Sequence, residues 1–132
     1  MTTFVKTDGG RSNYFKGRKP AGDCAARAMA IALGLDYKLC YDELATAHHA
    51  RTGKRTARDG ISKDDYSAVL RRHGWVWHSA PKLDGRKARH HDMPPGRIIA
   101  RMSKHYVAVI DCDIHDSWDS RHKMVYGYWF KA

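Results

Sequence analysis

The first half of the chain carries apolar residues at the spacing of helices. Three segments have this pattern: residues 24–33, 37–50 and 62–74. The first is apolar almost all round its surface except at Arg27, as in a helix that is buried on most sides. Asp23 and Asp36 precede the first two segments and Ser62 begins the third, each at a position from which a side chain can cap a helix. The pattern therefore predicts three helices.

The second half of the chain changes to the alternation of apolar and polar residues that is typical of strands. Five segments have the pattern of short strands: residues 75–80, 97–103, 105–111, 114–119 and 123–130. Short turns separate the last four, which we therefore expect to pair in chain order as an antiparallel meander. Because helices come first and strands follow, the predicted fold class is α+β. The basic segment 82–96 is expected to be a loop.

The length of the chain changes this picture little. Its 132 residues suffice for one domain with a modest core, with residues 1–22 as an extended N-terminal arm. No apolar run approaches 18 residues and no secretory signal precedes the helices, so we expect no membrane span. Three widely spaced cysteines do not form a disulfide framework, which favours the cytoplasm.

The charge of the chain widens the choice of function. Lysine and arginine exceed aspartate and glutamate by 24 − 14 = 10, which raises the affinity for nucleic acid, acidic proteins or anionic lipid. Two basic runs, RTGKRTARD from residue 51 and GRKARHH from residue 85, are the segments that would contact phosphates. No zinc-finger, helix-turn-helix or ribonucleoprotein pattern accompanies them. A nucleic-acid-binding module is therefore the alternative function.

No metal site is predicted from the histidines and cysteines. Adjacent histidines at 48–49 and 90–91 point to different faces, and neither His-x-x-x-His nor Cys-x-x-Cys occurs in the chain. The histidines and cysteines are therefore interpreted as surface, core or catalytic residues.

Cys24 stands where a reactive cysteine is expected, as the first residue of a helix and directly after Asp23. The unpaired N–H groups and the positive dipole end of a helix N-terminus lower the pKa of a thiol. The same N–H groups can stabilise a developing oxyanion. Cys40 lies within an apolar helical stripe and Cys112 in a tight turn, so neither has this setting. The alternative interpretation of Cys24 is a buried core cysteine.

A thiol nucleophile needs a base, and His105 is the candidate among nine histidines because it begins the apolar strand HYVAVID. If the chain turns at residues 111–112, Trp118 opposes His105 and Asp116 is a diagonal neighbour on the same face. Asp116 would then orient the imidazole, and Trp118 would shield the pair from water. Asp119 has the opposite parity and is the second choice for the acid.

The blocks GDCAARA, KHYVAVID, HDSWD and YGYW together resemble the papain-like cysteine peptidases. In that family the third catalytic residue is commonly an Asn followed by Ser-Trp. Residues 116–118 are Asp-Ser-Trp, similar to the bacteriocin-processing peptidases of the same superfamily. The small size and the run of blocks are similar to papain-like proteins encoded by bacteriophages. The resemblance covers residues 20–35 and 97–129.

The resemblance implies a papain-like fold and a thiol hydrolase that cleaves peptide or isopeptide bonds. Cys24 would be the nucleophile, His105 the general base and acid, and Asp116 the orienting acid. It implies neither a metal nor an organic cofactor. The substrate would be a protein or peptide, acidic in view of the basic charge of the chain.

The chain departs from the family at the oxyanion hole. Papain-like peptidases place a Gln several residues ahead of the cysteine, whereas this chain contains no Gln. Asn13 is the candidate substitute if the arm folds back, and Arg18 or Lys19 lies nearer in sequence. Ala25 follows the cysteine where relatives commonly have Gly. A third interpretation is therefore a papain-like scaffold that binds a partner through a vestigial triad.

Overall fold

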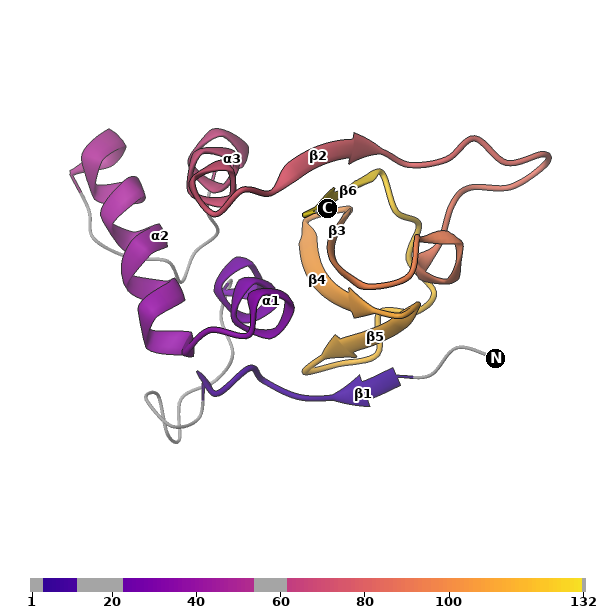
Figure 1. Cartoon of the computed structure of the whole chain (residues 1–132), viewed down its shortest axis with the longest axis horizontal. Helices are drawn as coiled ribbons and strands as arrows, with labels where there is room; N and C mark the ends of the chain where they lie inside the picture. The colour runs from indigo at the N-terminus through magenta and orange to yellow at the C-terminus, as the bar shows by residue number, and fades with distance from the viewer. Residues whose placement is uncertain (1–3, 12–22, 54–61, 132) are drawn as a thin grey trace.

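The structure is a computed structural model that describes residues 4–11, 23–53 and 62–131. In this part of the chain an α+β fold combines three α-helices with a six-stranded sheet. The elements in chain order are β1 Phe4–Lys6, α1 Cys24–Leu33, α2 Tyr37–Thr52, α3 Lys63–Arg72, β2 Val76–Ser79, the 3-10 helix η2 His90–Asp92, β3 Arg97–Met102, β4 His105–Ile110, β5 Asp113–Asp116 and β6 Gly127–Phe130. The three α-helices lie on one side of the sheet (Figure 1).

The order of the strands in the sheet is β1-β5-β4-β3-β6-β2, antiparallel except where β1 runs parallel to β5. The predicted meander is therefore right for β3, β4 and β5 and wrong for β6, which pairs with β3. The alternation of residues fixes which face a strand buries but not which neighbour it takes. After β5 a connection over residues 117–126 returns the chain to the other side of β3, and β2 then covers the free edge of β6.

The hairpin between β4 and β5 has the register that the sequence predicts. Ala108 lies opposite His115 and Val109 opposite Ile114, the register in which position 105 faces position 118. The turn residues, at 111–112, both have positive φ, 48° and 71°, as a two-residue type I′ turn requires. This register brings the end of β5 back towards the start of β4.

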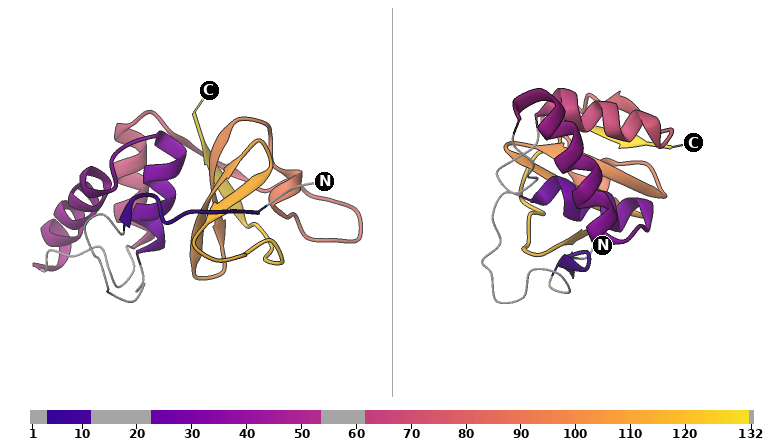
Figure 2. Two further views of the ribbon diagram at one scale, coloured as in Figure 1. Left: turned by 90° about the horizontal axis from the view of Figure 1, so that it is seen from below. Right: turned by 90° about the vertical axis from the view of Figure 1, so that its left-hand side faces the viewer.

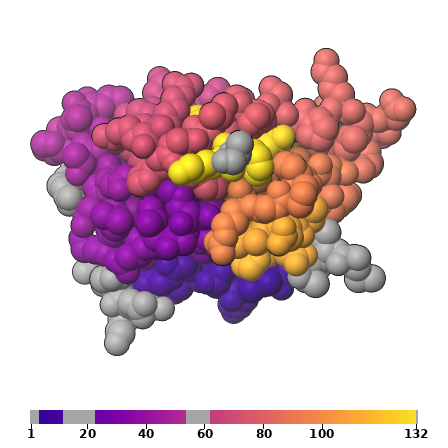
Figure 3. Space-filling view, viewed as in Figure 1, coloured from indigo at the N-terminus to yellow at the C-terminus, as the bar shows by residue number. Residues whose placement is uncertain are grey.

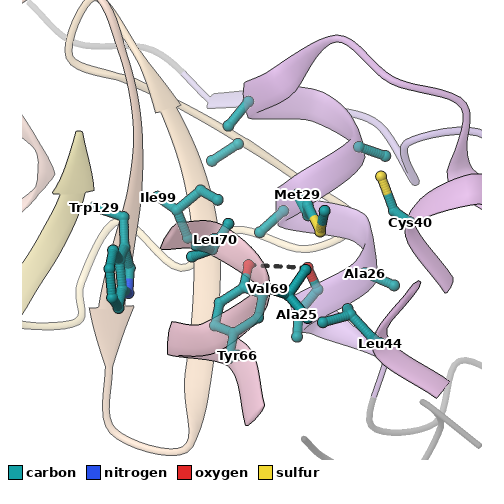
Figure 4. Packing of buried hydrophobic residues seen from close by; sticks show 14 of the residues in the cluster. Ala25, Ala26, Met29, Cys40, Leu44, Tyr66, Val69, Leu70, Ile99 and Trp129 are labelled. Carbon is teal, nitrogen blue, oxygen red and sulfur yellow. Dashed lines mark hydrogen bonds between the residues drawn. The ribbon is translucent and has the colours of Figure 1, made fainter. Parts of the chain in front are cut away.

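The central strand β4 is buried on both faces. Ala108 packs with α1 and α3 in one apolar cluster, and Val107 and Val109 pack in a second cluster on the opposite face. Figure 4 shows the first cluster, in which the hydroxyl of Tyr66 donates a 3.0 Å hydrogen bond to the carbonyl oxygen of Ala25. Small residues along α1 allow this helix to approach the sheet closely.

Residues 4–11 tie the two layers together. The strand β1 extends along β5, and the chain then continues to α1, where Gly9 lies beside Arg27 and Ile31. Figures 2 and 3 show this indigo segment running along both the helices and the sheet. The predicted extended arm thus contains a strand at its start, and residues 12–22 lie outside the described part of the chain.

Several predicted boundaries need correction. The helix α2 continues to Thr52, two residues past its predicted end at residue 50 and into the basic run that begins at residue 51. Residues 54–59 of that run lie outside the described part of the chain. The strand β5 ends at Asp116 and not at residue 119, because the chain bends after the acid. The predicted loop 82–96 contains the short helix η2. Among the described residues, no helix combines the length and the apolar character that a membrane crossing needs.

Ser62 caps α3 as predicted, because its hydroxyl oxygen accepts a 3.1 Å hydrogen bond from the N–H of Asp65. The side chains of Asp23 and Asp36 make no capping hydrogen bond, so the predicted caps of α1 and α2 are wrong in this respect. Asp23 is instead buried in contacts with other side chains, which concern the site below.

Gly127 of β6 offers a test of the sheet. A Cβ atom at this position would lie 2.2 Å from the indole ring of Trp77 on the neighbouring strand. We expect Gly127→Ala to lower the free energy of unfolding by about 1–3 kcal/mol, measured by urea denaturation, because the methyl group overpacks the site. The double variant Gly127→Ala/Trp77→Leu should recover part of this loss. Equal midpoints for Gly127→Ala and the parent would contradict the packing of β2 on β6.

Candidate active site

Cys24 is the first residue of α1, and its side chain is half-buried. The N–H groups of the first helical turn have no acceptor within the helix, so they point out of the N-terminus beside the sulfur. The helix begins here because a run of small apolar residues follows, and it ends at Gly34, which adopts the left-handed conformation with φ 68°. Packing of α1 against β4 brings the N-terminus of the helix to the start of that strand.

The neighbours that favour the thiolate form of Cys24 are the side chain of His105 and the backbone N–H of Tyr106. Burial alone would raise the pKa of this thiol. The hydrogen bonds and the positive charges of His105 and Arg27 outweigh burial, so the pKa of Cys24 is lowered. The other two cysteines differ, because burial raises the pKa of Cys40 to about 12 and also raises the pKa of Cys112.

The imidazole of His105 is held from behind by Asp116. Nε2 of His105 lies 2.6 Å from Oδ2 of Asp116, and both side chains are almost completely buried. Because Nε2 is engaged by the acid, Nδ1 is the nitrogen left for the thiol of Cys24. Burial alone would lower the pKa of His105, but the hydrogen bonds to Asp116 and Cys24 raise it. A thiol with a lowered pKa thus faces an imidazole with a raised pKa.

Three further groups hold the carboxylate of Asp116 in place. The backbone N–H of Ser117 donates to Oδ1 over 2.7 Å, and the buried hydroxyl of Ser120 donates to Oδ2 over 3.3 Å. A nitrogen of the Arg27 guanidinium lies 3.9 Å from Oδ1. The bend after β5 therefore serves to wrap the chain around the acid.

Trp118 lies against the imidazole of His105, with ring centroids 4.7 Å apart and planes tilted by 41°. The indole is 41% exposed, so one face covers the imidazole and the other meets solvent. It reaches this position from the bend after β5 and not from a strand position opposite His105. An apolar ring here limits the access of water to the bond between His105 and Asp116.

The second-choice acid is not brought to the imidazole. Asp119, the second-choice acid, is exposed and forms an ion pair of 2.7 Å with Arg121. Asn13, Arg18 and Lys19, the candidates for the oxyanion hole, lie outside the described residues. Among the described residues, the oxyanion donors beside the sulfur are thus the backbone N–H groups at the start of α1.

The sequence analysis missed a buried ion-pair network next to the site. The carboxylate of Asp23 is completely buried and is contacted by Arg11 over 2.6 Å and by Arg27. The hydroxyl of Tyr37 donates to the same carboxylate over 2.6 Å. Since Arg27 also approaches Asp116, one guanidinium connects the residue before Cys24 with the acid behind the imidazole.

One signal in the sequence pointed to this network. Arg27 is the single charged residue of the apolar helix α1, and it lies four residues after Asp23, which is the spacing of a helical ion pair. A charge on an otherwise apolar helix requires a partner when the helix is buried. Arg11 and Tyr37 carried no such signal, because their contacts with Asp23 depend on the path of the chain.

A cavity of about 370 Å³ opens beside the thiol. It is lined by Cys24, Lys63, Arg101, Met102, Lys104, His105 and Tyr106. Larger hollows of about 600 and 480 Å³ lie elsewhere and are not lined by Cys24 or His105. The thiol and the imidazole are therefore accessible to a substrate from a defined side.

No group of three or more histidine, cysteine or acidic side chains in the described parts of the chain could hold a metal ion. Comparison with protein-family models, with curated proteins and with solved structures gives no match. The geometry of the site therefore carries the functional argument.

The buried position of Arg27 leads to a prediction on stability. Arg27→Met should lower the free energy of unfolding by about 3–5 kcal/mol, since it leaves Asp23 and Asp116 buried with less compensation. Urea denaturation measures this change. Arg121→Met is the matched control, because it removes the same charge from an exposed ion pair and should leave the midpoint almost unchanged. Similar effects of the two substitutions would contradict a structural role for the network.

Proposed function

We propose that the protein is a cysteine-dependent hydrolase of papain-like fold that cleaves peptide or isopeptide bonds. The observation that carries this proposal is the grouping of Cys24, His105 and Asp116. Cys24 stands at a helix N-terminus and lines an open cavity together with His105, and Nε2 of His105 lies 2.6 Å from Oδ2 of Asp116. Nucleophile, base and orienting acid in this order form the arrangement that thiol hydrolysis needs.

The opposite pKa shifts of Cys24 and His105 favour transfer of the thiol proton to the imidazole. The resulting thiolate attacks the carbonyl carbon of the scissile bond, and the carbonyl oxygen becomes an oxyanion. The N–H groups at the start of α1 donate hydrogen bonds to this oxyanion. Asp116 stabilises the imidazolium and keeps Nδ1 directed at the sulfur.

The second half of the reaction returns the enzyme to its starting state. The imidazolium of His105 gives its proton to the leaving amine nitrogen as the C–N bond breaks, which leaves a thioester on Cys24. A water molecule then gives a proton to His105 and attacks the thioester. Cleavage of the C–S bond releases a carboxylic acid and regenerates the thiol. An amine in place of this water would give transfer, so the apparatus also fits an amidase or a transferase.

The fold supports the papain-like assignment at a coarse level. A buried helix bears the cysteine at its N-terminus, and an antiparallel part of the sheet bears the histidine and the acid. Residues 116–118 keep the order of acid, Ser and Trp, and the Trp ring covers the imidazole. The same resemblance favours a bacteriophage-encoded protein. Three free cysteines, with a site that needs a reduced thiol, favour action in the host cytoplasm.

Cysteine alkylation tests this proposal directly. Among the three cysteines, Cys24 should react fastest with iodoacetamide, with an apparent pKa well below the free-thiol value of about 8.5. His105→Ala should abolish this advantage, because it removes the main group that lowers the pKa of the thiol. Mass spectrometry of the labelled peptides from acid to mildly alkaline pH gives the rates. Cys40 and Cys112 serve as internal controls.

Uniformly slow labelling of the three cysteines would reject the enzymatic reading. The net charge of +10 would then favour the alternative, a nucleic-acid- or partner-binding module with a vestigial triad. Binding of a random DNA duplex that weakens steeply with salt would support that alternative.

The hydrogen bond between His105 and Asp116 predicts a change in the pH profile. Asp116 raises the pKa of His105, so the imidazolium persists to higher pH in the parent than it would without the carboxylate. In Asp116→Asn, the alkaline limb of the pH profile of peptide hydrolysis should therefore lie at a pH about one to two units lower than in the parent. Asp119→Asn is the control and should leave the limb in place. An equal shift in both variants would contradict the assignment of Asp116.

A further inference from the structure

The cavity beside Cys24 is lined by three cationic side chains that come from three different places in the fold. Lys63 is the first residue of α3, Arg101 belongs to β3, and Lys104 lies in the turn between β3 and β4. Among the described residues that line this cavity, none is acidic. We propose that it binds a carboxylate of the substrate next to the scissile bond, so that the enzyme selects acidic peptides. This inference rests on the hydrolase function proposed above.

In the described part of the chain, the three cations have no acidic partner in a salt bridge. Within the described residues, neither Lys63, Arg101 nor Lys104 forms a salt bridge, and other basic residues do. The ion pairs elsewhere on the surface include Lys38–Asp42, Arg51–Asp65, Arg86–Asp92 and Arg121–Asp119. Cationic charge is therefore left uncompensated at the place where a substrate must enter. Like charges gathered in a hollow attract an anion more strongly than the same charges dispersed over a surface.

The backbone holds two of these cations in defined positions. Arg101 lies directly opposite Tyr106 in the register of β3 and β4. Lys104 has φ 53° in the turn, between Met102 and His105, which are also paired across the two strands. A side chain that leaves the backbone from a tight turn next to His105 starts within a short distance of the reacting atoms.

The apolar part of the cavity indicates what kind of anion fits. Met102 is buried and Tyr106 is half-buried, so the lining combines apolar surface with cations. An aspartate or glutamate side chain has the matching arrangement of a short apolar stem and a terminal carboxylate. A partly enclosed hollow of about 370 Å³ has the size of a site for a small group. Nucleic acid is instead bound along extended tracks of phosphate contacts, and this geometry therefore favours an acidic peptide.

Two alkylating reagents of nearly equal size test the charge preference without a known substrate. Iodoacetate is an anion and iodoacetamide is neutral. With either reagent, the thiolate of Cys24 attacks the methylene carbon, a C–S bond forms and iodide leaves. The measured quantity is the ratio of the two rate constants for Cys24, divided by the same ratio for 2-mercaptoethanol. His105 itself attracts anions, so a high ratio in the parent alone does not show that the cavity cations act. The informative comparison is between the ratio of the parent and the ratios of variants that lack one of these cations.

Lys63→Gln, Arg101→Gln and Lys104→Gln should each lower the normalised ratio by about threefold, since each removes one charge from the neighbourhood of the thiol. Lys82→Gln is the matched control, because it removes the same charge at a residue that lines a different hollow, and its ratio should equal that of the parent. The ratio of the parent should fall as salt is added. Urea denaturation of each variant checks that the fold is intact.

The outcomes separate the inference from the function on which it rests. If Cys24 reacts fast with a lowered pKa but the three cavity variants behave like Lys82→Gln, the carboxylate site is rejected and the hydrolase stands. If Cys24 is as slow as the other cysteines, both are rejected. A further experiment measures how far three added molecules slow the reaction of Cys24 with iodoacetamide. The three are a peptide rich in glutamate, the same peptide with glutamine in place of glutamate, and a random DNA duplex. Protection by the acidic peptide alone is expected, whereas protection by the duplex alone would overturn the inference.

Discussion

The compensation of two buried carboxylates is the constraint on which the rest of the structure depends. Asp23 and Asp116 are almost completely removed from solvent, and an unpaired charge in such a position costs several kcal/mol. Arg27 contacts both acids, which joins the start of α1 to the end of β5. A buried ion pair is weak evidence for stability by itself, but it restricts which arrangements of helix and sheet are acceptable. Slippage of α1 along the sheet would separate Arg27 from Asp116.

The same constraint orders the site, because its residues neighbour the buried pairs in the chain. Cys24 follows Asp23 directly, and Asp116 lies 2.6 Å from the ring of His105. Fixing the two acids therefore fixes the sulfur at one end and the imidazole at the other. The positive charge of Arg27 also contributes to the lowered pKa of Cys24. A single guanidinium thus serves both the packing of the layers and the chemistry of the thiol.

Much of this arrangement could be predicted from the sequence, because local patterns determined it. The three helices, the hairpin between β4 and β5 and the shared face of His105 and Asp116 follow from periodicity and parity. The partner of β6 could not be predicted, since both of its faces are apolar and several neighbours would satisfy them. The contact of Arg11 with Asp23 could not be predicted either. It joins a segment that precedes α1 to the start of that helix, and the spacing of apolar residues gives no information on such a contact.

The positive charge of this protein is not spread evenly over its surface. A chain with ten excess positive charges is expected to attract any polyanion. Yet several surface cations are already paired with carboxylates, and two arginines are consumed by the buried network around Asp23. The cations that line the cavity beside the thiol act at short range. Salt screens charges in such a hollow less than charges on an open face. In the proposed hydrolase, a charge would contribute to selectivity only where the substrate passes. The placement of Lys104 next to His105 would therefore matter more than the net charge of the chain.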